Sequence, residues 1–321
     1  MGKWIAMTRF GYMLSSEEHG PKELVRQAVL AEHAGFEGLW VTDHFHPWID
    51  EQGESSFVWT VLGALSQVVS LPVTTAVTCP LVRIHPAIVA QAAATAQVMF
   101  DGRFRLGVGT GEALNEHIFG DPWPPACDRQ RMLEEAVGII RELWEGGVVT
   151  HHGEFYDVEN ARLYTLPDEP PPILVSGFGP ASAELAGRIG DGYVNVAPDA
   201  DLLEAYRKAG GAGKTAQGGL KVCWGTDEDD SRRLAHRLWP IEAITGEAHQ
   251  LLPMPRHFEQ LATLVRPDDL TLPAGPDPEV HIAAIQQYVD AGFDEIYIAQ
   301  IGPDQEGFFE FYESAVLPRF R

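Results

Sequence analysis

The chain has 321 residues and carries 46 Asp and Glu against 23 Lys and Arg, which gives a formal net charge of −23 at pH 7. A protein this acidic is repelled by phosphate backbones and by anionic lipid, which argues against nonspecific binding to nucleic acid or membranes. Because 45% of the residues are hydrophobic and 21% are charged, the composition is that of a folded globular protein rather than a disordered chain.

Strands and helices alternate along the whole sequence. Buried strands are predicted at residues 10–14, 36–41, 73–78, 105–108, 172–175, 193–196, 220–224 and 295–299. Helical stretches separate them, among them residues 21–34, 129–144, 181–189 and 285–290. In three of these repeats a glycine turn joins the helix to the next strand, as in the units that build a parallel sheet.

About eight such strands is the number at which a parallel sheet closes on itself. We therefore predict the α/β class and a single (β/α)8 TIM barrel that spans residues 1–321 as one domain, with its site at the carboxyl ends of the strands. An open, doubly wound sheet also alternates, but it normally carries a dinucleotide fingerprint after its first strand, and none is present. A hairpin-like segment near 149–160 and a proline-rich segment at 240–278 break the repeat, and we expect both as insertions at the barrel mouth.

Cysteine content and hydropathy bear on the compartment. The three cysteines, Cys79, Cys127 and Cys223, are too widely spaced for a CxxC pair, which is typical of a reduced, cytoplasmic protein. The longest apolar-rich stretch, residues 86–100, is shorter than the ~18 residues of a membrane span. The N-terminal segment lacks the uninterrupted apolar core of a signal peptide. We expect a cytoplasmic enzyme with a small-molecule substrate and no membrane or nucleic-acid partner.

Chemically active side chains follow the second strand, where Asp43, His44 and Trp48 lie close together in the sequence. In a barrel this end of the strand turns toward the active site. Histidine exchanges a proton near neutral pH, a step that typically contributes about 10²–10⁴-fold to a rate. A plainer interpretation makes Asp43 a helix cap and Trp48 a core aromatic residue.

The same segment contains a His-x-His pair, His44 and His46. In barrel hydrolases such a pair can bind a catalytic metal. No HExxH motif accompanies it, so no metal site is predicted, and a metal-dependent hydrolase is kept as the alternative from a different class.

Two glycine-rich loops follow later strands. Residues 107–116 combine four small or glycine positions with the polar side chains Thr110, Glu112 and Asn115, so backbone amides and side chains could both approach a ligand. Residues 176–180 precede a predicted helix, whose free N-terminal amides could hold an anion such as a phosphate. Three loops would thus converge on one face of the barrel.

At these residues the sequence resembles the luciferase-like monooxygenase superfamily, and within it the dehydrogenases that use the deazaflavin coenzyme F420. The resemblance covers nearly the whole chain. It rests on Gly11-Tyr12 with Glu17, Asp43-His44-Phe45 through Trp48, Thr78-Cys79-Pro80, residues 86–91, residues 109–116 and Gly190-Asp191-Gly192.

The resemblance implies a homodimeric oxidoreductase that moves a hydride between a substrate carbinol carbon and C5 of the deazaflavin. It assigns four catalytic residues: His44 as the base for the hydroxyl proton, Trp48 and Glu17 to steady developing charge, and Glu112 on the N1 side of the ring. The cofactor contacts it implies are Asp43, Ala76, Val77, Thr78, Thr110, Gly111, Asn115, Ser176, Gly177 and Gly179.

Two further features follow from the resemblance. A non-proline cis peptide bond would join Ala76 to Val77 behind the ring. The anionic tail of the coenzyme needs positive charge, for which Lys22, Arg83 and Arg188 are the candidates.

The substrate is expected to differ from that of the sugar-phosphate members of this group. Those members carry a lysine soon after the strand that follows Gly-Asp-Gly, but residues 197–199 here are Ala-Pro-Asp. A dianion would enter a pocket without its cations, so we expect a small neutral alcohol or carbonyl rather than glucose 6-phosphate, with Trp224 in the substrate pocket. An FMN-dependent monooxygenase or reductase is the alternative within the superfamily.

Overall fold

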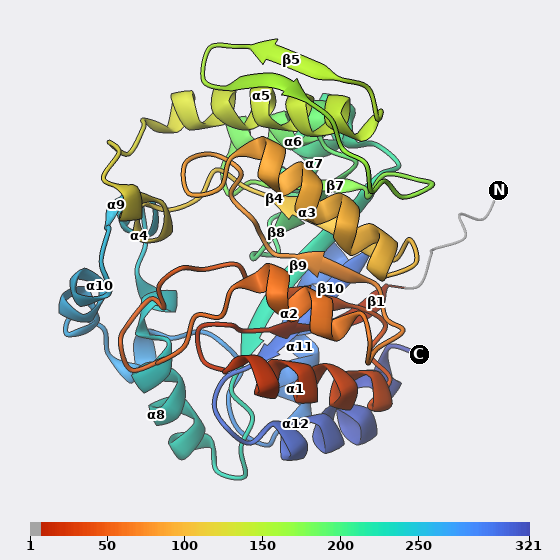
Figure 1. The fold of residues 1–321 in the computed structure, drawn as a ribbon. Coiled ribbons are helices and arrows are strands. Elements are labelled where there is room, and N and C mark those ends of the chain that lie inside the picture. Colours follow the sequence, from red (N-terminus) through yellow and green to blue (C-terminus); the bar gives the residue numbers. More distant parts are fainter. Residues whose placement is uncertain (1–7) are drawn as a thin grey trace.

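A closed parallel barrel forms the centre of the computed structural model, which describes residues 8–321 (Figure 1). Around the barrel the strands run in the order β1 (Arg9–Leu14), β2 (Leu39–Val41), β3 (Val73–Thr75), β4 (Phe104–Val108), β7 (Ile173–Ser176), β8 (Gly192–Asn195), β9 (Thr215–Val222) and β10 (Glu295–Gln300). Pairing of β1 with β10 closes the sheet. The predicted eight-stranded α/β barrel is confirmed, and the rim where the carboxyl ends of the strands meet is called the mouth below.

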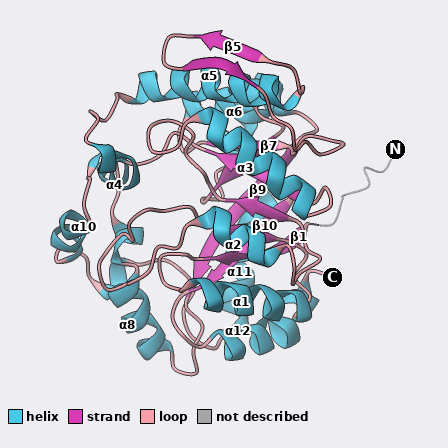
Figure 2. Ribbon diagram, viewed as in Figure 1, coloured by secondary structure: helices cyan, strands magenta, loops and turns pink. Residues whose placement is uncertain are grey.

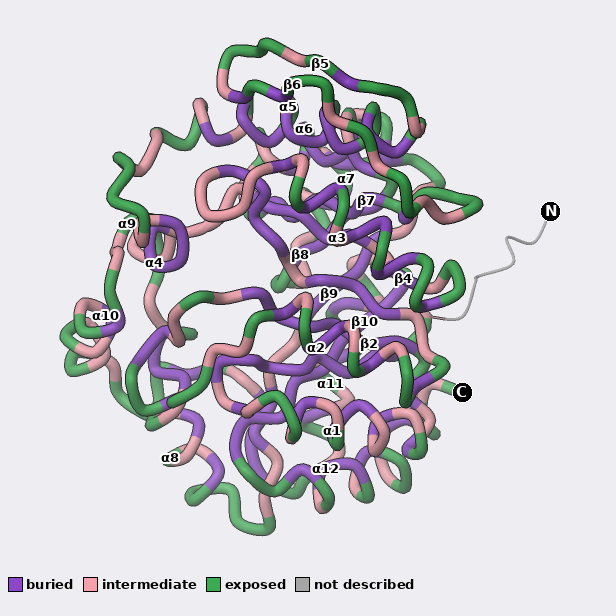
Figure 3. Tube along the Cα trace, in the orientation of Figure 1, coloured by how far each residue is buried: buried purple, intermediate pink, exposed green. Residues whose placement is uncertain are grey.

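Helices surround the barrel (Figure 2). They are α1 (Pro21–His33), α2 (Val58–Leu65), α3 (Pro86–Met99), α4 (Ala113–Glu116), α5 (Ala126–Trp144), α6 (Pro180–Ile189), α7 (Ala200–Tyr206), α8 (Glu228–Leu238), α9 (Ala248–Leu251), α10 (Pro255–Ala262), α11 (Pro278–Ala291) and α12 (Gln305–Phe311). The longer helices bury an apolar stripe, as α1 does with Leu24, Ala28 and Ala31. Burial is therefore concentrated on the strands and on the helix faces that meet them (Figure 3).

Strands β2 and β3 are shorter than their apolar sequences predict. β2 begins three residues later than predicted, and β3 ends at Thr75, three residues earlier. Directly after β3 the peptide bond between Ala76 and Val77 is cis, as the resemblance implied. Thr78 then pairs with Val108 in an isolated bridge. The chain therefore leaves regular strand geometry just where it reaches the mouth.

Strand β9 begins earlier than predicted, at Thr215 rather than at residue 220. The middle of the strand contains Gly218 and Gly219, residues with low strand propensity. A Cβ on Gly219 would lie 2.5 Å from the ring of Trp40, and one on Gly218 would lie 2.6 Å from the ring of Tyr288. Aromatic rings press on both faces of this strand, so packing requires glycine and overrides local propensity.

Side chains fill the end of the barrel opposite the mouth. Trp40 stacks on Tyr297 with ring centroids 4.6 Å apart. Trp40 Nε1 donates to Gln217 Oε1 at 2.7 Å, while Glu295 Oε2 accepts from Gln217 Nε2 at 2.7 Å and from Arg105 Nη1 at 2.8 Å. Because this closed end is occupied, a ligand with a ring system can enter the barrel only at the mouth.

The two predicted insertions lie in different places. The hairpin of β5 (Val149–His152) and β6 (Asp157–Ala161) packs along the outer face of α5, where Glu135 Oε1 accepts the backbone N–H of Tyr156 at 3.0 Å (Figure 1). Residues 240–278 carry helical turns with α9 and α10, and α9 packs beside α4 next to the mouth. The second insertion therefore adjoins the mouth, whereas the hairpin lies on α5 and reaches the loop after β3 through Tyr156, whose hydroxyl donates to Leu81 O at 3.2 Å.

No helix within residues 8–321 combines the length and the apolar character needed to cross a membrane.

Candidate active site

The mouth brings His44 and Glu17 together. His44 follows β2 and Glu17 follows β1, and these strands are neighbours in the barrel. His44 Nε2 lies 3.4 Å from Glu17 Oε1, with the two side chains 12% and 2% exposed. Residues 27 positions apart in the chain thus form a nearly buried imidazole–carboxylate pair.

The carboxyl group of Glu17 is held in its charged form. Burial alone would raise its pKa, but the facing His44 and two hydroxyl donors outweigh that effect and hold the pKa below its usual value. Thr42 Oγ1 and Ser15 Oγ each donate to Glu17 Oε2 at 2.8 Å. The imidazole of His44 therefore faces an anion at neutral pH.

Asn115 bonds to the loop that carries His44. Its Oδ1 accepts the backbone N–H of Phe45 at 2.8 Å and of His46 at 3.2 Å. Its Nδ2 lies 3.2 Å from His44 Nδ1 and 3.4 Å from Glu112 Oε2. This single amide thus ties α4 to the β2 loop and links two of the predicted catalytic residues.

Trp48 lies on the other side of the imidazole, with its ring centroid 5.3 Å from that of His44. The indole also meets the mouth insertion edge-on, at 5.3 Å from the ring of His249 and 5.2 Å from that of Phe258. The backbone N–H of Trp48 donates to Gln52 Oε1 at 2.8 Å. Trp48 is therefore both a buried packing residue and a wall beside His44.

Asp43 belongs to a separate charge cluster. Its two oxygens accept from Arg83 Nη2 and Thr78 Oγ1, each at 2.8 Å. Arg83 also reaches Glu116, with Nε 3.4 Å from Oε1, and both carboxylates are fully buried. Asp43 is not a helix cap, and protein donors already occupy both of its oxygens. Arg83, a candidate for the coenzyme tail, is committed to two buried carboxylates.

The glycine loop packs directly against the bend after β3. A Cβ on Gly109 would lie 2.7 Å from Val77 Cγ2 and 3.6 Å from the Cβ of Ser176. Gly111 has a φ of +70°, and a Cβ there would lie 2.6 Å from Cys79 Sγ. Only glycine permits this approach, which places the loop, the cis peptide and Ser176 on one wall of the mouth.

The polar side of this wall is accessible. Thr110, Gly111 and Glu112 are partly exposed, whereas the residues of α4 that follow are buried. Across the wall, the Gly177 N–H donates to Val194 O at 3.2 Å and the Gly179 N–H to Ser182 Oγ at 3.2 Å. The amides of Gly177 and Gly179, two of the predicted cofactor contacts, thus already have protein acceptors.

Trp224 is not brought to the His44 cluster. Its indole stacks on Phe311 with ring centroids 5.7 Å apart, and Gly307 of α12 lies close under the ring, where a Cβ would be 2.4 Å away. The backbone N–H of Trp224 donates to Gln300 Oε1 at 2.8 Å. The side chain thus turns outward onto α12, which corrects its predicted place in the pocket and leaves its backbone at the mouth.

Two charged residues of the mouth escaped the sequence analysis. Glu18 accepts from Trp239 Nε1 and, at 2.9 Å, from the backbone N–H of Gly302. Lys221 lies on the same face of β9 as Gly219, the face that points into the barrel. The Nζ of Lys221 lies 2.9 Å from Glu242 Oε1. A lysine inside a strand and the second of two adjacent glutamates offer no local signal that would have identified them.

The two histidines of the His-x-His pair have separate partners. His46 Nδ1 bonds to Leu114 O at 2.9 Å, whereas His44 faces Glu17. Across residues 8–321, no group of three or more His, Cys, Asp or Glu side chains is arranged to hold a metal ion. The positions of these side chains therefore do not support the alternative of a metal-dependent hydrolase.

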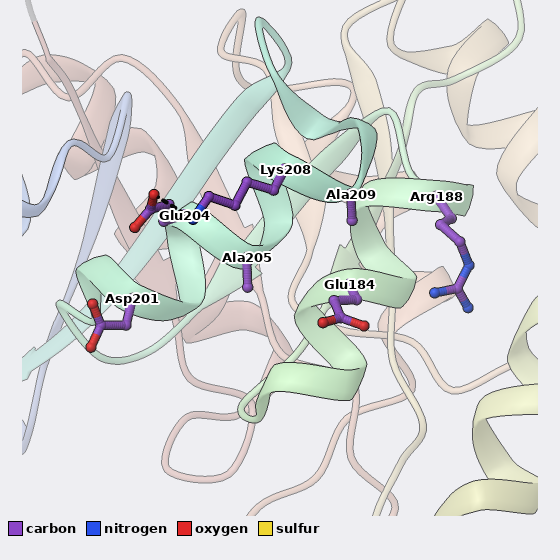
Figure 4. A pocket seen from close by; sticks show the side chains of 7 residues that line it. All are labelled: Glu184, Arg188, Asp201, Glu204, Ala205, Lys208 and Ala209. Carbon is purple, nitrogen blue, oxygen red and sulfur yellow. Dashed lines mark ion pairs between the residues drawn. The ribbon is translucent and has the colours of Figure 1, made fainter.

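A surface cavity of about 500 Å³ lies elsewhere, between α6 and α7 (Figure 4). Positively and negatively charged side chains line this cavity, among them Arg188, Lys208 and Glu204. Lys208 Nζ forms an ion pair with Glu204 Oε1 at 2.7 Å. Of the residues predicted for the site, Arg188, a candidate for the coenzyme tail, is the one that lines it. Arg188 is therefore on the outer helical layer, away from the mouth.

Known proteins resemble the chain along nearly its whole length. Residues 1–295 match the luciferase-like monooxygenase family. An F420-dependent glucose-6-phosphate dehydrogenase of Microbacterium testaceum is 37% identical over 98% of this chain and 97% of its own length. An F420-dependent hydroxymycolic acid dehydrogenase of Mycobacterium tuberculosis is 38% identical over 97% of this chain and 88% of its own length.

Among solved structures, an F420-dependent secondary alcohol dehydrogenase in complex with an F420-acetone adduct superposes with a TM-score of 0.90 at 32% identity. That match covers 98% of this chain and 99% of the other. The barrel fold is the one expected from the sequence resemblance, and the matches to known proteins cover nearly the whole chain. The chain belongs to the luciferase-like monooxygenase family.

Proposed function

We propose that the protein is an F420-dependent oxidoreductase that transfers a hydride between C5 of the deazaflavin and a neutral alcohol or carbonyl compound. The observation that carries this proposal is the nearly buried pair of His44 and Glu17, with Nε2 and Oε1 3.4 Å apart, at the mouth of the barrel. The names of the relatives support the cofactor, because the glucose-6-phosphate, hydroxymycolic acid and secondary alcohol dehydrogenases are all F420-dependent.

The residues at the mouth fit a planar ring system. The bend after β3 and the glycine loop pack so closely that they present a smooth wall, since a Cβ on Gly109 would lie 2.7 Å from Val77. Thr110, Glu112 and Asn115 place polar groups along its edge. When bound, F420 supplies the hydride acceptor or donor. Thr110, Gly111, Glu112, Asn115 and Ser176 would hold the ring, and the contacts predicted for Asp43, Ala76, Val77, Thr78, Gly177 and Gly179 belong to the same proposal.

The protein side of the reaction is a proton transfer. His44 exchanges the proton of the substrate hydroxyl through Nε2, and the charged Glu17 stabilises the imidazole when it is protonated. Trp48 packs beside the imidazole and limits access of water to it. Glu112 lies at the edge of the ring site, 3.4 Å from Asn115 Nδ2, where it stabilises charge on the N1 side.

Charge at the mouth supports a neutral substrate. Two cations of the mouth are already paired, Lys221 with Glu242 at 2.9 Å and Arg83 with the buried Asp43 and Glu116. A phosphate dianion bound by Lys221 or Arg83 would have to displace one of these carboxylates and would also face Glu17. We therefore favour an uncharged alcohol or ketone over glucose 6-phosphate, although several relatives are named for that sugar phosphate.

Cofactor choice is tested by titrating the purified protein with F420 and with FMN while its tryptophan fluorescence is recorded. We expect saturable quenching by F420, because Trp48 lies at the mouth. Quenching by FMN without quenching by F420 would overturn the cofactor and favour the FMN-dependent alternative.

Substrate class is tested with a panel of alcohols and ketones, followed by the absorbance of F420 or of its reduced form. We expect turnover of neutral secondary alcohols or of their ketones, and poor turnover of glucose 6-phosphate. Saturable oxidation of glucose 6-phosphate at micromolar concentration would contradict the assignment of a neutral substrate.

We further propose that the protein is a homodimer. Support comes from the α2–α3 side of the barrel, where Phe57, Ile88 and Val98 are 57%, 57% and 43% exposed. Light scattering on the purified protein at micromolar concentration would return the mass of two chains, and the mass of one chain would refute this proposal.

A further inference from the structure

The amide of Asn115 uses all of its hydrogen-bonding positions. Its oxygen accepts from two backbone N–H groups, those of Phe45 and His46. Its nitrogen has two protons, one toward Glu112 Oε2 and one toward His44 Nδ1. A flipped amide would set the nitrogen against two donors and the oxygen against a carboxylate, so the orientation is fixed. A donor therefore faces Nδ1 of His44 at 3.2 Å, which favours a lone pair on that nitrogen.

The other nitrogen of His44 is constrained in the same direction. Nε2 lies 3.4 Å from Glu17 Oε1, and a carboxylate can only accept. The hydroxyls of Thr42 and Ser15 each donate to Oε2 of that carboxylate at 2.8 Å and so favour its charged form. A lone pair on Nε2 would be repelled by Glu17, whereas a proton there is attracted. Glu17 and Asn115 therefore favour the same tautomer, whereas the carbonyl oxygen of His46, 3.3 Å from Nδ1, favours the other.

We propose that Asn115 is a positioning residue that holds the neutral His44 in the tautomer protonated on Nε2, so that the imidazole of the cofactor-free protein presents a donor to the mouth. Acceptance of a substrate proton at Nε2 requires the other tautomer, with the Nδ1 proton donated to the carbonyl oxygen of His46, 3.3 Å away. That step moves the ring proton from Nε2 to Nδ1 and leaves a lone pair on Nε2. The amide of Asn115 must release Nδ1 for this change.

The tautomer does not depend on the proposed function, but its consequence for the reaction does, because that consequence assumes His44 as the proton acceptor. Several ionisable groups surround the ring and enter any pH dependence. Glu17 faces it from the β1 loop, Glu112 lies behind Asn115, and the Asp43–Arg83 pair adjoins it in the chain. His46, which stacks on His117 at 5.7 Å, and His249, which meets Trp48, are the neighbouring imidazoles.

The test is nitrogen NMR of the cofactor-free protein labelled with ¹⁵N-histidine, with the His44 signals identified by their loss in His44→Gln. In Asn115→Asp one oxygen still accepts from Phe45 and His46, but the atom that faces Nδ1 becomes an acceptor. The matched control is Gln52→Ala, which removes the acceptor for Trp48 N in the same loop without a contact to His44.

We expect the wild-type protein and Gln52→Ala to show a proton on Nε2 and a bare Nδ1. Asn115→Asp should carry a proton on Nδ1, and the midpoint of the His44 titration should rise by at least about one pH unit, because a carboxylate then faces the ring. A wild-type protein protonated on Nδ1 overturns the proposal. So does an unchanged ring in Asn115→Asp, or a change of tautomer in Gln52→Ala.

The kinetic consequence is measured with the F420-loaded enzyme. The acid limb of the pH profile for alcohol oxidation should move upward by at least about one pH unit in Asn115→Asp, an effect that a merely structural role would not produce. If the NMR signals change as expected and the pH profile does not, Asn115 sets the tautomer but His44 is not the proton acceptor, and the proposed mechanism fails by itself.

Discussion

Buried carboxylates lie at both ends of the barrel, but their partners differ. At the closed end Glu295 is bound by Arg105 and by Gln217. Burial raises the pKa of this carboxyl, but the guanidinium groups of Arg105 and Arg9 outweigh burial, so the pKa lies below its usual value. At the mouth Glu17 is also held in its charged form, yet the group that faces it is the imidazole of His44, a side-chain type suited to proton transfer. The carboxylate at the closed end is paired with guanidinium groups, whereas the one at the mouth is paired with an imidazole.

The cluster of Asp43, Arg83 and Glu116 shows that position alone does not make a catalytic group. It adjoins His44 in the chain, but its carboxylates are paired with a guanidinium, as at the closed end. An arginine stays protonated at every physiological pH, so such a cluster supports the loops without exchanging protons. The difference between the ends of the barrel therefore lies in the partner of each carboxylate.

The largest effect is expected at the closed end. Glu295→Ala leaves Arg105 without its carboxylate inside the barrel and should lower the free energy of unfolding by about 3–5 kcal/mol. Urea unfolding measures the loss. Because the site is at the other end, kcat of the folded variant should stay within about tenfold of wild type. Unchanged stability would show that Glu295 is not the anchor of this end.

At the mouth, His44→Ala should lower turnover by at least about 10²-fold while F420 binding changes little, because the imidazole handles a proton and not the ring. Turnover and fluorescence titration measure the two quantities. His152→Ala, in the exposed hairpin, is the control and should match wild type. If turnover is unchanged in His44→Ala, the imidazole is outside the proton path.

A smaller, pH-dependent effect is expected at Glu18. Burial, with the nearby Glu17, raises its pKa to about 7 from an ordinary value near 4.5, despite the donors Trp239 and Gly302. Since the folded pKa is the higher one, the contribution of this carboxyl to stability is present below pH 4.5 and is lost as the pH rises toward 7. Glu18→Gln cannot ionise, so its free energy of unfolding relative to wild type should rise by about 1–3 kcal/mol between pH 5 and pH 8.

Urea unfolding of both proteins at these two pH values measures that difference. A difference that stays constant with pH would show that Glu18 titrates at its ordinary value and that the mouth does not perturb it.

Local sequence pattern was sufficient to predict the order of the strands and the loops that contain the candidate site residues. Alternating strands and helices predicted the barrel, and parallel strands place their carboxyl ends at one rim, so His44, Glu112 and Asn115 were expected at the same place. The prediction was weaker where packing overrides propensity. β9 was placed too late because Gly218 and Gly219 do not resemble strand residues, although the rings of Tyr288 and Trp40 require glycine there.

The amino-acid sequence by itself determined the fold class and the family, because these depend on periodicity and on short motifs, and the resemblance to that family in turn implied the cis bond after Ala76. Only the tertiary structure decided which charges are paired and where side chains point: Asp43 with Arg83, forty residues away, and Trp224 outward onto α12. Such choices depend on side-chain direction and on contacts between distant segments, which no local pattern contains. For the same reason the bonds of Asn115 to the His44 loop emerge only once the barrel has closed.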